Sequence, residues 1–194
     1  MAKTYAGVGS RDTPQDMLDL MYRMAKVLCD LGWVGNSGEA PGADWYFHEG
    51  ARSSSNYGPG MFNAIIPWNG FKTQNEVKVY SKPGNNIYVL DEARRRRAEM
   101  LGIGARGTYA GLNTPGKIAL HSRNAMQVLG MNLMTPIRFL ICWAQPVGKQ
   151  GKVKGGTNTA VALALHFGID VINLATPNGL NRAMTFLEEY EEAA

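Results

Sequence analysis

A chain of 194 residues with 45% hydrophobic content is long enough for one domain with a complete hydrophobic core. Its formal net charge of +4 favours anionic partners but falls short of the dense basic face of a dedicated DNA-binding protein. No secretory apolar segment follows Met1 and no apolar stretch reaches membrane-spanning length, so we expect a cytoplasmic protein without a membrane partner. Cys29 and Cys142 lie in apolar patterns, which predicts buried, reduced thiols.

Short apolar strands alternate with amphipathic helices along the chain. The patterns predict strands over 4–9, 33–37, 62–68, 87–90, 137–143 and 169–175, and helices over 14–32, 42–52, 92–101, 114–129 and 178–192. We expect a long polar surface loop over 69–85 and a mobile or ligand-covering loop over Gly102–Asn113. Neighbouring parallel strands must be joined by crossover connections about as long as the predicted helices. Residues 1–194 are therefore predicted to form a single α/β domain. Its expected architecture is a Rossmann-like open, mainly parallel sheet with helices on both faces.

A run of four arginines, Arg94–Arg97, falls in one of these predicted helices. Consecutive helical residues point in different directions, so the four side chains cannot form one patch. We expect solvated side chains there, with an interface or nucleic-acid role as the alternative.

A glycine-rich turn, Gly155-Gly156-Thr157-Asn158-Thr159, opens an apolar helix between two predicted strands. Two glycines allow the backbone to approach a ligand closely, and a helix N-terminus presents free N–H groups and partial positive charge to an anion. The turn therefore indicates a phosphate-bearing small molecule, although a tight turn without a ligand explains the same residues.

Two further turns follow predicted strands, where open parallel sheets bind ligands. Gly9 and Ser10 permit close approach, and Arg11 can bind phosphate or carboxylate; the alternative is a tight turn with an exposed arginine. In the second turn, which begins at Ser37-Gly38, Asp44 can accept ribose hydroxyls or simply interact with the helix dipole. Glu39 is either a general base or an exposed loop residue.

Polar residues also interrupt the apolar helix predicted over 114–129. His121, Arg123 and Asn124 form a candidate ligand-facing side, with a solvated helix face as the alternative. Trp143 could stack on a base or fill the core, and Tyr109 is a second candidate for stacking. His48 and His166 have no metal-ligand partners at useful spacing, so we expect structural or surface roles and no metal site.

In their order and spacing, the three turns resemble the SLOG superfamily of Rossmann-like proteins, which includes the Lonely Guy enzymes and DNA-processing protein A. The motifs that carry this resemblance are residues 5–11 with Thr13-Pro14, residues 37–44, and residues 155–159. The chain looks closest to small bacterial or bacteriophage members. The resemblance implies a nucleotide pocket over the glycine turns and homo-oligomerisation, with no further cofactor.

Lonely Guy enzymes release the base from a nucleoside monophosphate with the motif Gly-Gly-x-Gly-Thr-x-x-Glu. The aligned positions here carry Asn158 in place of the third glycine and Ala162 in place of the glutamate. Ala162 supplies no carboxylate, so an enzyme of this kind would need Glu39 or Asp44 instead.

Other SLOG domains bind nucleotide-derived immune signals, including cyclic ADP-ribose-type molecules, and such binding needs no catalytic acid. The resemblance therefore favours a binding protein, such as a bacteriophage protein that sequesters a signal in anti-phage defence. A nucleotide N-glycosidase is the first alternative, and single-stranded DNA binding as in DNA-processing protein A is the second. The predicted ligand-binding residues are Gly9, Ser10, Arg11, Ser37, Gly38, Asp44, Tyr109, Arg123, Asn124, Trp143, Gly155, Gly156, Thr157 and Thr159.

Overall fold

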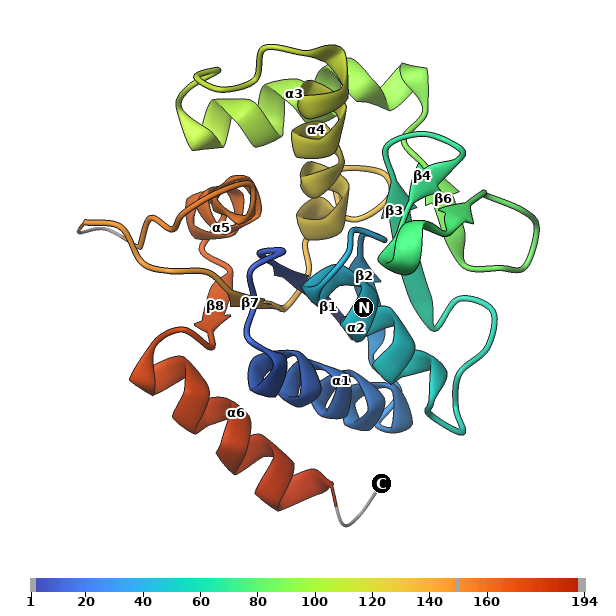
Figure 1. Cartoon of the computed structure of the whole chain (residues 1–194), viewed down its shortest axis with the longest axis vertical. Helices are drawn as coiled ribbons and strands as arrows, with labels where there is room; N and C mark the ends of the chain where they lie inside the picture. Colours follow the sequence, from blue (N-terminus) through green and yellow to red (C-terminus); the bar gives the residue numbers. More distant parts are fainter. Residues whose placement is uncertain (1–2, 149–150, 192–194) are drawn as a thin grey trace.

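The computed structural model describes residues 3–148 and 151–191, and its centre is a parallel sheet (Figure 1). In these residues the strands lie in the order β6-β3-β2-β1-β7-β8. Their bounds are β1 (Thr4–Gly9), β2 (Val34–Ser37), β3 (Phe62–Ile66), β6 (Ile87–Val89), β7 (Phe139–Trp143) and β8 (Asp170–Asn173). The predicted Rossmann-like α/β sheet is confirmed, and the predicted strands agree with it to within a few residues.

Helices cover both faces of the sheet, as predicted (Figure 1). One face packs against α1 (Gln15–Asp30), α2 (Ala43–Arg52) and α6 (Pro177–Tyr190). The other packs against α3 (Glu92–Arg106), α4 (Pro115–Leu129) and α5 (Thr157–His166). Side chains of β7 alternate between these two cores: Phe139 and Ile141 face α1 and α6, whereas Leu140 and Cys142 face α4 and α5.

The segment 69–85 is not the featureless loop that its polar composition predicts. It contains an antiparallel hairpin of β4 (Phe71–Lys72) and β5 (Lys78–Val79), joined through the short 3-10 turn η1 (Gln74–Glu76). The Gly70 amide donates to the Val79 carbonyl (2.8 Å), and the Phe71 side chain is buried. A single buried aromatic side chain thus anchors a segment that is mostly polar.

The glycine-rich stretch 102–113 also differs from the expected loop, because α3 continues to Arg106. Gly102 lies inside α3, where an added Cβ would fall 3.3 Å from both the His121 carbonyl oxygen and Thr159 Cγ2. This glycine therefore permits close packing of α3 on α4 and α5. Gly107, with φ of 79°, ends the helix. The ligand-covering role of residues 107–113 remains a prediction.

Both cysteines are buried free thiols, as predicted, and burial raises the pKa of Cys142 to about 12. Across the described residues, no helix combines the length and apolar character needed to cross a bilayer.

In the arginine run, Arg94 pairs with Asp91 at 2.6 Å and Arg95 with Glu92 at 3.4 Å. An interface role for this run stays a prediction.

Candidate functional site

A cavity of about 360 Å³ opens beyond the carboxyl end of β1, between α4 and the N-terminus of α5. Its position is the point where the strand order reverses between β1 and β7, which is where open α/β sheets bind ligands. We call it the switch-point cavity. All three glycine turns of the sequence contribute to its wall, together with α4; the main polar lining residues are Ser10, Arg11, Asp44, His121, Arg123 and Thr157.

The turn after β1 is held by backbone hydrogen bonds. The Ser10 amide donates to the Trp143 carbonyl (3.2 Å), so β7 already uses a group that we expected to face phosphate. An added Cβ on Gly9 would fall 2.4 Å from Ala43 Cβ, so packing against α2 explains this glycine. Arg11 is exposed at the cavity wall and forms no ion pair within residues 3–148 and 151–191.

Two of the predicted site residues form a buried ion pair with each other. Arg123 Nη2 donates to Asp44 Oδ2 at 2.9 Å, and Nη1 donates to the Ile65 carbonyl at 3.1 Å. The side chains are 5% and 7% exposed, so Arg123 is not the solvated helix residue of our alternative interpretation. Asp44, in the first turn of α2, has a partner besides the helix dipole. Burial raises the pKa of Asp44, while the guanidinium of Arg123 acts in the opposite direction. Arg123 Nε is buried without a hydrogen-bond partner in the described residues.

A buried amide network connects this ion pair to the glycine turn of α5. In the orientation that satisfies both of its ends, the side chain of Gln127 accepts from Arg123 Nη1 (3.1 Å) and from the Gly38 amide (2.7 Å), and donates to Asn124 Oδ1 (3.0 Å). Asn124 Nδ2 in turn donates to the Gly156 carbonyl (3.3 Å). Sequence reasoning missed Gln127, although its position four residues after Arg123 in an apolar helix was a usable signal.

His121 connects α4 to the first turn of α5. Its Nδ1 lies 2.7 Å from Thr159 Oγ1, and its Nε2 would lie 3.8 Å from a Cβ on Gly156. Burial lowers the pKa of His121 to about 4, with smaller contributions from the positive charges of Arg106 and Arg123. The imidazole is therefore neutral at pH 7, and its ring forms part of the cavity wall beside the helix N-terminus.

Other predicted ligand-binding residues lie outside the cavity lining. Trp143 packs against the α1–α6 side of the sheet, which is the core position of our alternative, and Tyr109 is exposed with its hydroxyl 3.1 Å from Glu99 Oε1. Ser37 donates from its hydroxyl to the Gly7 carbonyl (2.5 Å). Gly155, with φ of 75°, shapes the turn in open space.

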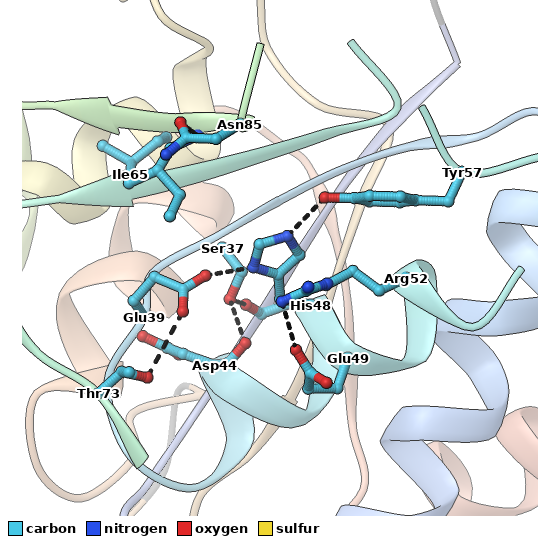
Figure 2. Close-up of polar contacts among 12 residues, drawn as sticks. Ser37, Glu39, Asp44, His48, Glu49, Arg52, Tyr57, Ile65, Thr73 and Asn85 are labelled. Carbon is cyan, nitrogen blue, oxygen red and sulfur yellow. Dashed lines mark hydrogen bonds and ion pairs between the residues drawn. The ribbon is translucent and has the colours of Figure 1, made fainter. Parts of the chain in front are cut away.

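Glu39 is neither exposed nor in the cavity wall. Figure 2 shows its carboxylate paired with His48 Nδ1, while His48 Nε2 lies 2.8 Å from the Tyr57 hydroxyl. The His48 ring also stacks on Phe62, with ring centroids 4.6 Å apart. Glu39 and His48 are 3% exposed, which agrees with a structural role for His48. His166 is a surface residue, as expected.

The site has several of the groups that bind anions in proteins. It presents a helix N-terminus, one exposed arginine and one buried arginine with an unpartnered N–H. Two carboxylates lie in its wall: Asp44 is engaged by Arg123, whereas Asp12 is exposed. Glu39, outside the wall, is engaged by His48. Within the described residues, no group of three or more His, Cys, Asp or Glu side chains is placed to hold a metal ion.

Fold and site together define a Rossmann-like α/β protein with a ligand-sized cavity at its topological switch point. No family model matches the chain, and no curated protein matches it significantly. Among solved structures, it is similar to the molybdenum cofactor carrier protein of Chlamydomonas reinhardtii, with 16% identity over 97% of this chain and 86% of that chain and a TM-score of 0.49. DNA processing protein A of Helicobacter pylori is also similar, with 17% identity over 96% and 81% and a TM-score of 0.42. The resemblance to the SLOG superfamily remains an expectation from the three turns of the sequence.

Proposed function

We propose that this protein binds a nucleotide or nucleotide-derived small molecule in the switch-point cavity, with a phosphate group between Arg11 and the N-terminus of α5. The observation that carries the proposal is the convergence of Arg11, Arg123 and the Gly156-Thr157 turn on one cavity. These groups come from three separate segments of the chain, and each supplies N–H donors suited to an anion.

The buried Arg123 is a second anion-binding group of the site, besides the helix N-terminus. Arg123 Nε has no hydrogen-bond partner in the part of the chain that the structure describes, although its side chain is 95% buried. A buried N–H without a partner is unfavourable by about 1–3 kcal/mol. Because Arg123 also forms part of the cavity wall, its guanidinium charge would attract an anion in the cavity.

The arrangement supports binding over turnover. A nucleotide N-glycosidase needs a carboxyl group free to exchange protons at the cavity. Ala162 stands where the Lonely Guy motif has glutamate, Asp44 is paired with Arg123, and Glu39 contacts His48 outside the cavity wall. Asp12 is an exposed carboxyl group of the wall, but it lies in the turn after β1 and not at the motif position. We therefore retain signal binding, of the cyclic ADP-ribose type in a bacteriophage anti-defence protein, as the specific form of the proposal.

Ligand binding can be tested directly with AMP, NAD and cyclic ADP-ribose isomers by isothermal titration calorimetry and native mass spectrometry. We expect at least one of these nucleotides to bind and to be recovered intact after heat denaturation. Arg11→Gln should weaken binding about tenfold or more, equivalent to about 1.4 kcal/mol. The matched control is Arg96→Gln, which removes the same charge from an exposed site on α3 outside the cavity lining.

Three results would contradict this proposal. The first is the absence of binding by all of these nucleotides, and the second is release of free base during incubation. The third is tighter binding to single-stranded DNA than to any nucleotide, with the steep salt dependence of phosphate-backbone contacts.

We further propose a cytoplasmic homo-oligomer, which light scattering coupled to size-exclusion chromatography would test.

A further inference from the structure

Arg11 belongs to the walls of two cavities. One is the switch-point cavity, and the other is a cavity of about 410 Å³ beside the β4–β5 hairpin, which we call the hairpin cavity. The hairpin cavity is lined by Arg11, Pro41, Trp68, Phe71 and Lys72 together with Gly70 and Glu76. A ligand that places its phosphate at Arg11 therefore has a second space within reach on the other side of that arginine.

Trp68 is the large exposed aromatic residue in the wall of the hairpin cavity. Its ring packs edge-on against Phe71, with centroids 5.5 Å apart and an interplanar angle of 81°. Its six-membered ring also lies close to Gly116 at the start of α4, where an added Cβ would fall 3.6 Å away. Trp68 nevertheless remains 39% exposed. An anchored indole with an accessible surface is suited to stack on a planar heterocycle.

The hairpin that carries this wall contacts Arg123, in the wall of the switch-point cavity, and the turn before α2. Phe71 lies under the guanidinium of Arg123, with 5.9 Å between Cζ and the ring centroid. The Gly42 amide donates to Gln74 Oε1 at 3.2 Å, and Thr73 Oγ1 lies 3.5 Å from Glu39 Oε2, a contact drawn in Figure 2. These contacts hold the two cavities in a defined relation to each other.

We propose that Trp68 is the stacking platform for the base of the bound nucleotide, with the base in the hairpin cavity and the phosphate beside Arg11. This inference rests on the function proposed above and narrows the ligand to molecules that join a phosphate to an aromatic heterocycle. It assigns to Trp68 the role that sequence reasoning gave to Trp143 or Tyr109. Trp143 packs against the core on the α1–α6 side, and Tyr109 lines neither cavity.

Calorimetric titrations with AMP and with ribose 5-phosphate, which lacks the base, separate the two halves of the site. Trp68→Ala should weaken AMP binding about tenfold or more and leave ribose 5-phosphate binding within about twofold, because a stacked base interacts with the whole indole ring. Tyr109→Ala is the matched control, since it removes an exposed aromatic side chain and should change neither affinity. AMP should also quench tryptophan fluorescence in the wild type but not in Trp68→Phe, which retains a stacking ring and should still bind.

Each outcome decides a separate question. If the wild type binds neither probe, the base platform is rejected, and the proposed function falls with it only if NAD and the cyclic ADP-ribose isomers also fail to bind. If the wild type binds AMP but Trp68→Ala does so equally well, the platform is wrong and the proposed function stands. Equal loss of both probes in Trp68→Ala would show a general effect on the site and would also overturn the platform. A selective loss in Tyr109→Ala would transfer the role to that residue.

Discussion

The guanidinium of Arg123 lies directly against Gly38: an added Cβ on Gly38 would fall 1.3 Å from Nη1 and 2.5 Å from Asp44 Oδ2. The space that glycine leaves open is thus filled by the buried ion pair. We had predicted this glycine as one of the ligand-binding residues. Its more immediate role is to admit the arginine that forms part of the cavity wall.

Gly38→Ala is expected to destabilise the fold, because the methyl group would push Arg123 away from Asp44 and leave two buried charges poorly paired. Disruption of a buried ion pair typically costs about 3–5 kcal/mol, so we expect a loss near the lower end of that range in urea denaturation. Gly104→Ala is the control: this α3 residue has no atom within 4 Å of an added Cβ, and the substitution should stabilise the helix by about 0.5–1 kcal/mol. Equal stability of Gly38→Ala and the wild type would refute the steric argument.

The buried pair of Glu39 and His48 predicts strong coupling in a double-mutant cycle. His48→Phe preserves the ring stacked on Phe62 but leaves the Glu39 carboxylate without its partner, so we expect a loss of about 3 kcal/mol in free energy of unfolding. Adding Glu39→Gln to this variant should restore part of the loss, since the buried charge is then absent. Strictly additive effects of the two substitutions would show that the pair does not act as a unit.

His121 predicts a specific dependence of stability on pH. Its pKa in the folded protein is about 4, below the ordinary value of 6.5, so the unfolded chain binds more protons between these two values. The contribution is therefore complete above about pH 6.5 and is lost as the pH falls towards 4. Because the imidazole is only partly buried, we expect a loss of about 1–2 kcal/mol after allowance for solvent screening.

Urea denaturation of the wild type and of His121→Gln between pH 7 and pH 4 measures this contribution as a difference, since the carboxyl groups are common to both proteins. The slope attributable to His121 should be absent in the variant. NMR titration of the imidazole gives a direct check, and a midpoint near pH 6.5 would contradict this prediction. Binding of a phosphate group in the cavity should raise the pKa of His121, because the anion opposes the field of the arginines.

Gly156→Ala should impair binding more than stability. Gly156 has an ordinary helical φ of −66°, and an added Cβ would lie 3.7 Å from His121 Cε1, an allowed contact that narrows the cavity. We expect a change in stability of less than about 1 kcal/mol, within the range for substitutions at a helix N-cap, and a loss of AMP affinity on the order of tenfold. Isothermal titration calorimetry and thermal denaturation measure the two effects.

Gly155→Ala provides the opposite pattern. This glycine has a positive φ of 75° with open space around it and lies outside the cavity lining, so alanine should destabilise the turn by about 1–2 kcal/mol without filling the site. If Gly156→Ala binds AMP as well as the wild type does, the phosphate does not lie at this turn.

Most of the fold could be predicted from the sequence, because strand and helix patterns depend on residues close together in the chain. The strand of Thr4–Gly9 was predicted to the residue, and α4 begins at Pro115, one residue after its expected start. The two failures have a common origin. The β4–β5 hairpin depends on the burial of Phe71, and the length of α3 depends on Gly102 packing against α4 and α5. Such tertiary contacts can override local composition.

The candidate site was predictable only in its position. The three glycine turns indicated which strand ends would meet, because parallel strands place their carboxyl ends at one edge of the sheet. The partner of each polar side chain was beyond this reasoning. Asp44 and Arg123 are 79 residues apart, and His121 and Thr159 are 38 apart, so no local pattern links them.

The sequence by itself determined the order of strands and helices and the edge of the sheet where the glycine turns converge, since these follow from local periodicity and the geometry of parallel crossovers. Only the tertiary structure decided which contacts the residues of those turns make. The missing side chain of Gly38 leaves room for the guanidinium of Arg123. Asp44 and Glu39 are each engaged in a buried pair, and Arg11 lies in the walls of two cavities. The physical reason is that charge pairing and burial depend on which distant segments come into contact, and that is established only when the sheet assembles.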